Sequence, residues 1–556
     1  MGDAEQPEKR RRRRGAKSRD IAEDGPKQKE TSNKRKIEQV DPPSAPAPAP
    51  SAAPTPAPAP TIANATKSQV DNGKKNKKQK KKKLKIPKKG EPGYLSPTQL
   101  RNARKRRAKQ KKQGEVTEEN QESGNDATLQ KKNFKSNRDD PSLRYIKDPR
   151  SAPLVKKAKS FFKGMSIPFE VYVGELSGWR TVSKLPVRRS NDEEKSCVIG
   201  LFKPGSHTIV KVPNCVAHHP SINRTIEILQ KECDDLGIEP FNEFDGTGIL
   251  RYVCINVERN TGKVQLTLVW NAPPYSDGDG GNDDAGKELL DTFTKDLVGK
   301  SSQLQLHSLW VHFNSQSKHA DNVFDYGSSS DNSSLWKHVH GPKHIIETLD
   351  LSQCPTPNDV KLHFPPNVFR QANLDAFTKI VLAIRKYVMS YNNQERSETV
   401  LPTCLELYGG VGTLGLNICD LLSSFVSSDE NPYNKICFEK AAKLLSSKNR
   451  AKCTYIPKNA TDVIKEAKVL SKDCEILLVD PPRKGLGEYV TQSFIDAAGN
   501  ENGPKVLIYV SCGFEAFTRD CDQLLKSTKW KLDNAEGHLL FPGSDAIETL
   551  AFFRRT

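Results

Sequence analysis

The sequence predicts an α/β protein in three parts: a disordered basic arm (residues 1–150), an α+β central domain (151–340) and a doubly wound, Rossmann-like C-terminal domain (341–556). Three observations support this division. Positive charge is concentrated at the N-terminus, short β-branched runs with turn signals fill the middle, and apolar runs alternate with helical patterns toward the C-terminus. The part after the arm is long enough for two domains with proper cores.

The arm carries nearly all of the excess charge. The chain has 556 residues, with 87 Lys and Arg against 68 Asp and Glu, and a net charge of +19. Residues 1–150 hold 40 basic and 19 acidic side chains, whereas the other 406 residues hold 47 and 49. Basic runs at 10–14, 74–89 and 101–112 flank a Pro/Ala-rich tract at 42–60. Such segments bury too little apolar surface to offset ordering entropy, so we expect disorder.

Three interpretations of the arm stay open. These interpretations are a solvated tail, a nuclear or nucleolar targeting signal, and a tether that binds the phosphates of nucleic acid without recognising its sequence. A nuclear or nucleolar location is favoured, with cytoplasm or an organelle as alternatives.

Composition argues against a membrane span and against a metal site. No run of 18 apolar residues occurs, so we expect no membrane span. The 12 cysteines are scattered singly without a CxxC pair, as is typical of reduced thiols. Cys215 with His218 and His219 is the nearest approach to a ligand cluster, but it lacks a second pair, and we predict no metal.

The middle part shows short strands and two helices. The predicted strands are 170–173, 196–201, 208–212, 251–257, 263–269 and 304–313, and the predicted helices are 222–236 and 289–298. Asn260-Thr-Gly262 predicts a hairpin between two of the strands, and 275–286 and 327–334 are predicted loops. This pattern indicates a mostly antiparallel sheet.

The C-terminal part alternates strands with helices. Leu374, Phe377, Val381, Ile384 and Val388 lie on one face of an amphipathic helix. The strands that follow are predicted at 403–408, 435–439, 453–456, 475–479 and 506–510, with helices between them. Such alternation is typical of a doubly wound parallel sheet.

A glycine-rich segment, Gly409-Gly-Val-Gly412-Thr-Leu-Gly415, follows the first of these strands and is predicted to open a helix. Glycines there let the backbone approach a nucleotide-like ligand, which could be a dinucleotide or S-adenosylmethionine. Glu439 is predicted at the end of the next strand, where a carboxylate can accept hydrogen bonds from both ribose hydroxyls. A solvated charge is the alternative for Glu439.

Side chains suited to ligand binding or catalysis follow two further predicted strands. Asp480-Pro-Pro-Arg-Lys-Gly485 follows one strand, and in open α/β sheets ligands bind at that edge. The next strand ends in Tyr509-Val-Ser-Cys512, so a thiol lies beside the predicted cofactor crevice. A lone cysteine after an apolar run is more often a core residue.

Several segments, in one order, resemble the RNA uracil-5-methyltransferases that form 5-methyluridine. They are Phe369-Arg-Gln371-Ala-Asn373, Glu406-Leu-Tyr408-Gly-Gly-Val-Gly412, Asp480-Pro-Pro-Arg-Lys-Gly485, Ser511-Cys512 and Phe541-Pro-Gly-Ser-Asp-Ala-Ile-Glu548. Leu250-Arg-Tyr-Val also looks like part of the family's central domain. The resemblance covers about residues 153–556 and leaves the basic arm outside.

The resemblance implies a reaction and a set of residues. Cys512 would add to uracil C6, C5 would accept the methyl group of S-adenosylmethionine, and Glu548 would remove the C5 proton. The cofactor site would be lined by Gln371, Tyr408, Thr413, Glu439 and Asp480. The uridine must leave its stack to reach Cys512, so base flipping or an unstacked loop is implied.

The chain departs from the family's pattern at several positions. Gly513-Phe514 stands where the family has Asn-Pro, and Ala546 stands where it usually has His. The chain shows neither the clustered cysteines nor the extra small barrel of some members, which favours tRNA over rRNA as substrate. We expect a monomer.

Two other functions remain as alternatives. An NAD-dependent oxidoreductase would account for the glycine loop and Glu439 but leaves Asp480, Cys512 and Glu548 unexplained. A catalytically silent RNA-binding or assembly factor would account for the basic arm and the altered segment after Cys512.

Overall fold

The structure is a computed structural model that describes residues 140–556, apart from 191–195, 204–205, 276–283, 316–323, 325–334, 355–358, 395–399 and 467–473. All of the described residues belong to one compact unit. The predicted arm up to residue 139 and the predicted loop 327–334 therefore lie outside the described residues. None of the helices that the structure describes is long and apolar enough to cross a membrane.

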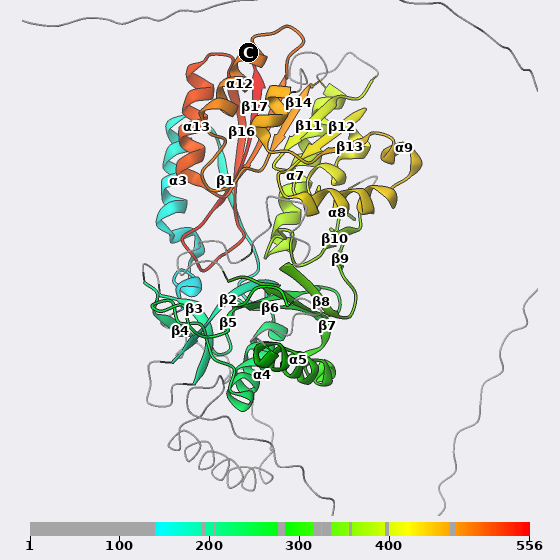
Figure 1. The fold of residues 1–556 in the computed structure, drawn as a ribbon. Coiled ribbons are helices and arrows are strands. Elements are labelled where there is room, and N and C mark those ends of the chain that lie inside the picture. Colours follow the sequence, from blue (N-terminus) through cyan, green and yellow to red (C-terminus); the bar gives the residue numbers. More distant parts are fainter. Residues whose placement is uncertain are drawn as a thin grey trace, which may run out of the picture. The chain divides into compact units, whose positions relative to one another are not determined.

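The C-terminal domain is built on one mixed sheet of eight described strands (Figure 1). These strands are β1 (Phe169–Val173), β11 (Thr403–Leu407), β12 (Ser424–Ser428), β13 (Cys453–Ile456), β14 (Ile476–Val479), β15 (Val506–Ser511), β16 (Trp530–Leu539) and β17 (Glu548–Arg555). Their spatial order is β1-β16-β17-β15-β14-β11-β12-β13. The five strands from β13 to β15 are parallel, and β17 runs antiparallel to both of its neighbours. The predicted doubly wound fold is confirmed.

Helices cover both faces of this sheet. They are α3 (Pro153–Gly164), α7 (Leu374–Gln394), α8 (Pro432–Lys443), α9 (Ser447–Arg450), α10 (Ala460–Glu466), α12 (Glu488–Ala498) and α13 (Phe514–Lys526). Alternate residues of one strand face opposite cores, because successive side chains of a strand point to opposite sides. Leu478 of β14 packs in the core that contains α7 and α8, whereas Leu477 packs in the core that contains α3, α12 and α13.

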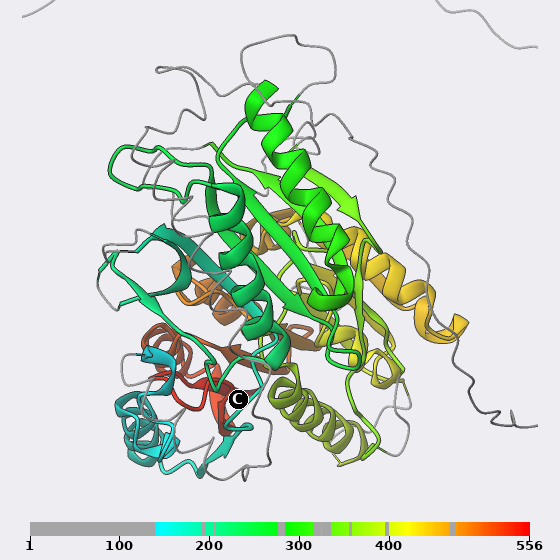
Figure 2. The same ribbon diagram turned by 90° about the horizontal axis from the view of Figure 1, so that it is seen from below.

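The central domain is a second sheet of seven described strands. They are β2 (Val182–Arg189), β3 (Cys197–Phe202), β4 (Ile209–Lys211), β5 (Leu250–Val257), β6 (Val264–Trp270), β7 (Leu306–Phe313) and β8 (Trp336–His340), in the order β4-β3-β2-β5-β6-β7-β8. Neighbours are antiparallel except β6 and β7. Figure 2 shows α4 (Pro220–Leu236) and α5 (Asp284–Gly299) lying across one face. The short α6 (Ser301–Leu304) precedes β7.

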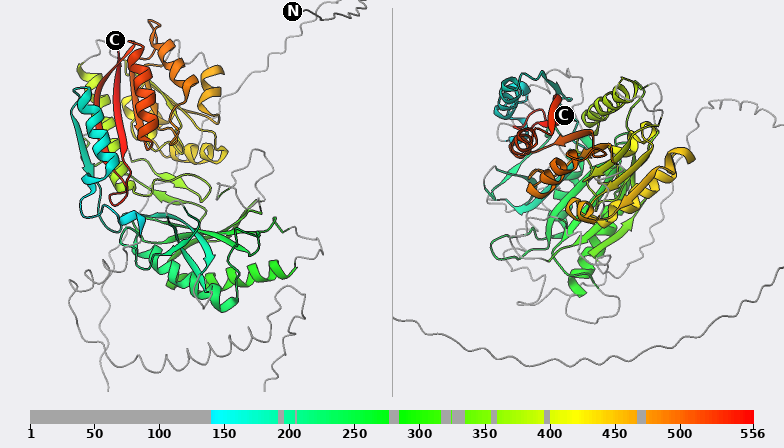
Figure 3. Two further views of the ribbon diagram at one scale, coloured as in Figure 1. Left: turned by 90° about the vertical axis from the view of Figure 1, so that its left-hand side faces the viewer. Right: turned by 90° about the horizontal axis from the view of Figure 1, so that it is seen from above.

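The predicted domain boundaries need correction at the N-terminal side. Residues 140–150, assigned to the arm, form two short 3-10 helices, Pro141–Leu143 and Pro149–Ser151, that contact the C-terminal domain. The strand predicted at 170–173 forms as β1, but it pairs with β16 and extends the C-terminal sheet. Figure 3 shows α3 and β1 in cyan at the edge of the red C-terminal strands, where β1 lies next to β16. The central sheet therefore begins near Val182.

The strand predicted at 435–439 is wrong, because these residues lie in α8. Pro432 occupies the first turn, and the Asn431 side chain caps the helix by accepting a hydrogen bond from the Tyr433 backbone N–H. The second strand of the doubly wound unit is instead β12. Its sequence, Ser-Phe-Val-Ser-Ser, lacks an apolar run and carries little signal of a strand.

A two-stranded ribbon connects the two domains. It consists of β9 (Ile345–Glu347) and β10 (Leu362–Phe364). The guanidinium of Arg370 is buried between them and the central sheet, where it donates to Glu347 Oε1 at 2.6 Å and to the carbonyls of Val257 and Thr181. The segment that carries Gln371 is thereby attached to both domains.

Candidate active site

The candidate site lies at the carboxyl ends of β11, β14 and β15. The strand order reverses between β11 and β14, and ligands of open α/β sheets bind at such a switch point. The glycine loop follows β11, Asp480 follows β14 and Cys512 follows β15. The segments singled out from the sequence are thus brought to one edge of the sheet.

The glycine loop turns sharply but does not open the predicted α-helix. Turns and two 3-10 helices, Gly415–Asn417 and Cys419–Leu421, follow it instead. Gly412 has φ +86°, and a Cβ there would approach the Phe438 ring to 2.6 Å. The loop therefore needs glycine for both its conformation and its packing. It lacks the helix N-terminus that binds the pyrophosphate of dinucleotides, so the structure disfavours an NAD site.

A buried carboxyl group, Glu406, ties this loop to β12. Its Oε1 accepts a hydrogen bond from the Gly415 N–H at 3.0 Å, and its Oε2 accepts one from the Ser427 hydroxyl at 2.6 Å. Burial raises the pKa of Glu406 to about 8, against these two hydrogen bonds. The sequence pattern indicates no role of its own for this residue, although it lies within a segment that resembles the family.

The acidic residue at the end of β12 is Asp429 and not Glu439. Asp429 Oδ2 accepts a hydrogen bond from the Gly410 N–H at 3.1 Å, so it lies directly beside the glycine loop. Its Oδ1 accepts from the Asn431 N–H and the Asn434 side chain, both at 2.9 Å. Glu439 lies exposed on α8, where its carboxylate is 3.9 Å from the Lys435 ammonium. The structure does not bring Glu439 to the strand end.

The other predicted cofactor residues surround the same edge. Tyr408 adopts φ +61° directly after β11, and its hydroxyl donates to the Leu486 carbonyl at 3.4 Å. Burial raises the pKa of Tyr408 to about 12. Thr413 is half-buried within the glycine loop, and Gln371 is half-buried next to Arg370. The Asn367 carbonyl accepts a hydrogen bond from the Asn431 side chain, which joins the segment before Gln371 to the end of β12.

The two predicted catalytic side chains are neighbours across a strand pair. Ser511 of β15 lies opposite Thr549 of antiparallel β17, so the adjacent positions, Cys512 and Glu548, end at the same edge. Cys512 is half-buried, whereas Glu548 is 5% exposed. Glu548 Oε1 is buried without a hydrogen-bond partner among the described residues. A buried, unsatisfied carboxylate oxygen is costly and is typical of a functional site.

Burial, and then the neighbouring charges, disfavour the ionised forms of the groups at the site. Burial raises the pKa of the Cys512 thiol to about 11, with further contributions from the charges of Glu548 and Asp480. Burial, and then the nearby Asp480, also raises the pKa of Glu548 well above its ordinary value. The pKa of Asp480 is raised to about 7 by burial and by Asp429. The positive charge of Arg483 opposes the shifts of Cys512 and Glu548.

Packing explains both of the residues that stand in place of the family's Asn-Pro after Cys512. A Cβ on Gly513 would collide with the carbonyl oxygen of Arg483 and lie 2.9 Å from its Cα, so only glycine fits there. Phe514 is fully buried at the start of α13 and packs among Phe161, Phe162 and Phe517. Neither substitution displaces Cys512 from the strand end.

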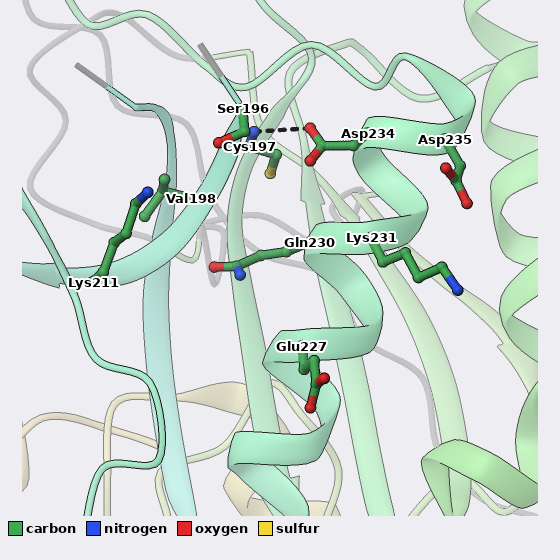
Figure 4. Close-up of a pocket in the computed structure, with 9 residues that line it drawn as sticks. All are labelled: Ser196, Cys197, Val198, Lys211, Glu227, Gln230, Lys231, Asp234 and Asp235. Carbon is green, nitrogen blue, oxygen red and sulfur yellow. Dashed lines mark hydrogen bonds between the residues drawn. The ribbon is translucent and has the colours of Figure 1, made fainter. Parts of the chain in front are cut away.

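The other described features singled out from the sequence form no metal site. Among the described residues no group of His, Cys, Asp and Glu could hold a metal ion. The Cys215 thiol donates to Asp140 at 2.9 Å, and His218 contacts Ser183 and Asn223 at 3.1 Å each. A polar pocket of about 310 Å³ lies between β3, β4 and α4 and is lined by residues such as Lys211, Glu227 and Asp234. Figure 4 shows these lining residues. None of the predicted site residues lines the pocket.

Comparison with known proteins identifies the family. No protein-family model matches the chain. A protein of Protochlamydia amoebophila named as an uncharacterized RNA methyltransferase is 33% identical over 407 residues, which cover 72% of this chain and 92% of that protein. A Clostridium acetobutylicum protein of the same description is 24% identical, over 68% of this chain and 71% of its own length. The chain belongs to the RNA methyltransferases.

A solved structure shows the same fold. The tRNA (uracil-54, C5)-methyltransferase of Pyrococcus abyssi, crystallised with S-adenosyl-L-homocysteine, matches with a TM-score of 0.52 and 20% identity. The match covers 72% of this chain and 82% of that one. The likeness therefore extends over both domains that the structure describes and is not limited to the doubly wound sheet.

Proposed function

We propose that this RNA methyltransferase transfers a methyl group from S-adenosylmethionine to C5 of a uracil in RNA. The observation that carries the proposal is the pairing of Cys512 and Glu548 at one sheet edge, with Asp480 close to both. A thiol beside a buried carboxyl group supplies the nucleophile and the base that substitution at C5 requires. Transfer RNA is the preferred substrate class, in keeping with the substrate of the Pyrococcus abyssi enzyme.

The residues at the switch point fit S-adenosylmethionine. The space where a Cβ of Gly410 would lie is open, which leaves room for close approach of a ligand, and the carboxylate of Asp429 lies beside that loop. Asp429 replaces Glu439 as the residue proposed to bind the ribose hydroxyls. Gln371, Tyr408, Thr413 and Asp480 complete the proposed cofactor site. When bound, the cofactor supplies an electrophilic methyl group.

The protein residues act on uracil in two stages. The Cys512 sulfur adds to C6 as a thiolate, and the electron pair of the C5–C6 double bond moves to give C5 carbanion character. After C5 is methylated it carries both a proton and the methyl group. The Glu548 carboxylate removes that proton, the C5–C6 double bond re-forms, and the C6–S bond breaks to release the thiolate.

The raised pKa values predict that methylation accelerates with pH. The thiol of Cys512 has a pKa of about 11, so the thiolate fraction grows about tenfold per pH unit below that value. The carboxyl groups of Asp480 and Glu548 also gain their base forms as pH rises. We therefore expect kcat/KM to rise from pH 7 to pH 9 in a pH–rate profile. A flat profile would show that none of these three ionisations limits the reaction.

The exposed Arg483 gives this pH dependence a specific test. Its positive charge lowers the pKa of both Cys512 and Glu548, so Arg483→Ala should move the rising limb to higher pH, whereas Arg483→Lys should keep it near the wild-type position. Salt should weaken the difference, because Arg483 is solvent-exposed. A uniform loss of rate at every pH in Arg483→Ala would mean that Arg483 binds RNA and does not tune the site.

The basic arm is proposed to bind RNA phosphates. Deleting residues 1–139 should leave thermal stability and single-turnover methylation at saturating RNA unchanged, because the deleted segment has no predicted core and the anchoring hydrogen bonds of Asp140 to Ser142 and Cys215 are kept. RNA affinity should fall, and the slope of log Kd against log salt should become shallower. Unchanged affinity and slope would leave the arm as a nuclear or nucleolar address, which localisation of a tagged full-length chain would test.

The direct test is methylation of defined RNA. The full-length protein, assayed as the proposed monomer, is incubated with methyl-labelled S-adenosylmethionine and an unmodified tRNA transcript, and the digested RNA is separated into nucleosides. We expect label in 5-methyluridine. Label in another nucleoside would contradict the assignment of C5, and binding of RNA without any label would favour the silent RNA-binding factor.

A further inference from the structure

The loop that leads to Glu548 is held by a segment far away in sequence. Residues 540–547 connect β16 to β17, and the part of this loop from 541 to 547 leads directly to Glu548. The N–H of Tyr145 donates to the carbonyl of Gly543 at 2.8 Å. A Cβ on Gly543 would collide with the carbonyl oxygen of Ser142 and lie 2.9 Å from the Leu143 Cα. The two backbones therefore touch, and glycine at 543 makes this approach possible.

The loop also caps a helix of that segment. Helix α3 begins at Pro153, and the residue before it, Ala152, has no side chain that could cap the helix. The exposed Asp545 supplies the acceptor: its Oδ1 takes a hydrogen bond from the Leu154 N–H at 2.8 Å. A carboxylate at this position satisfies a free N–H of the first turn and interacts favourably with the helix dipole.

Helix α3 is a firm support for this contact. Val155, Ala158 and Phe162 are fully buried in the core beneath the sheet, and the Phe162 ring stacks on Phe169 of β1 at a centroid distance of 4.3 Å. Burial of this kind fixes a helix much more strongly than one surface hydrogen bond does. The hydrogen bond between the Leu154 N–H and Asp545 therefore holds the loop in a position that α3 sets.

The segment is fixed at its N-terminal end as well. Asp140 is buried and accepts hydrogen bonds from the Ser142 N–H at 2.8 Å and from the Cys215 thiol of the central domain at 2.9 Å. Leu143 and Phe541 pack in one apolar cluster with Trp179 and Cys215. The loop thus lies between a segment anchored in both domains and the strand that carries Glu548.

We propose that Asp545 is a positioning residue for Glu548. By capping α3 it holds loop 541–547 against residues 140–154, and the loop in turn sets the direction in which the Glu548 carboxyl leaves β17. The inference rests on the proposed function, in which Glu548 removes the C5 proton after methylation. Loss of the cap should impair that proton transfer, and leave cofactor binding and addition of Cys512 intact.

The test compares Asp545→Ala with Asp545→Asn and with a remote cap. Asn keeps an oxygen acceptor for the Leu154 N–H but removes the charge. Ser446→Ala removes the cap of α9, whose Ser446 side chain accepts from the Asn449 N–H away from the site. The readouts are kcat, the KM for S-adenosylmethionine, melting temperature, and the fraction of protein held as a covalent RNA adduct during turnover.

For Asp545→Ala we expect kcat to fall about tenfold or more, because small misplacements of a reacting group are costly. The KM for S-adenosylmethionine should stay unchanged, and the adduct fraction should rise. Asp545→Asn and Ser446→Ala should resemble the wild type. Gly543→Ala, which forces the two backbones apart, should reproduce the Asp545→Ala pattern.

Three results would overturn the inference. One is an Asp545→Ala protein that behaves like Ser446→Ala. Another is an Asp545→Asn protein as slow as Asp545→Ala, which would indicate contact of the charge with substrate. The last is a loss of rate in parallel with melting temperature and without adduct, which would indicate a structural role. If the wild type itself forms no 5-methyluridine, the proposed function fails instead, so the two failures are distinguishable.

Discussion

Cys512→Ala is expected to abolish methylation of RNA while binding of S-adenosylmethionine persists. The thiol lies at the end of β15, next to Glu548 across the strand pair. Without the sulfur, uracil C5 gains no carbanion character, and the rate should fall by several orders of magnitude. Calorimetry with S-adenosylmethionine and single-turnover methylation of a tRNA transcript measure the two properties separately.

Cys453 provides the matched control for this substitution. It is also half-buried, but it begins β13 and so lies at the opposite edge of the parallel sheet. Cys453→Ala should therefore retain activity. Substantial 5-methyluridine formation by Cys512→Ala would remove the covalent step from the mechanism, and loss of cofactor binding in that protein would show that the substitution had damaged the fold.

Glu548→Gln is expected to trap a covalent protein–RNA complex. If Glu548 acts only after methylation, the variant still adds Cys512 to C6 and still methylates C5. The C5 proton then stays in place, so elimination stops, because an amide of nearly the same size cannot act as the base. A band of protein joined to RNA should persist on a denaturing gel.

The covalent adduct must depend on both S-adenosylmethionine and Cys512. Omission of S-adenosylmethionine, or addition of Cys512→Ala to the same chain, should remove the band. A Glu548→Gln protein that turns over normally would exclude Glu548 as the base. An inactive protein without adduct would place Glu548 before methyl transfer, or leave it a structural role in a buried position.

Strand ends can be predicted well where strands are apolar. The runs before Asp480 and Cys512 form β14 and β15, which are fully buried, so their sequences are nearly continuous in β-branched and other apolar residues. The chemistry that follows such strands must lie at one edge of a parallel sheet. The amino-acid pattern alone therefore predicts that Tyr408, Asp480 and Cys512 lie together.

The ribose-binding carboxylate cannot be located in the same way. In β12 the residues are mostly serine, and Ser427 and Ser428 are buried because their hydroxyls bond to Glu406. Residues 436–438 of α8 form an apolar run that looks like a strand, although burial of Cys437, Phe438 and Ala441 follows a helical spacing. Hydrogen bonds to Glu406 bury the serines of β12, which the local sequence pattern does not reveal. The sequence therefore predicts Glu439 as the ribose-binding residue in place of Asp429.

A long-range strand pairing explains why the first domain boundary could not be predicted from the sequence. Strand β1 joins the sheet edge by pairing with β16, more than 350 residues later in the chain. A run of five residues with mixed burial carries no sign of the sheet to which it belongs. For the same reason the sequence carries no sign of the contacts between residues 140–154 and the loop before Glu548.

Release of the C5 proton of uracil tests the central claim most directly. A tRNA transcript labelled with tritium at C5 of its uridines is incubated with the full-length protein, with and without S-adenosylmethionine. Substitution at C5 predicts tritium in water when the cofactor is present, with at least one tritium released for each methyl group incorporated at a labelled uridine. Methyl incorporation without tritium release would contradict the account, because the methyl group would then lie on another atom.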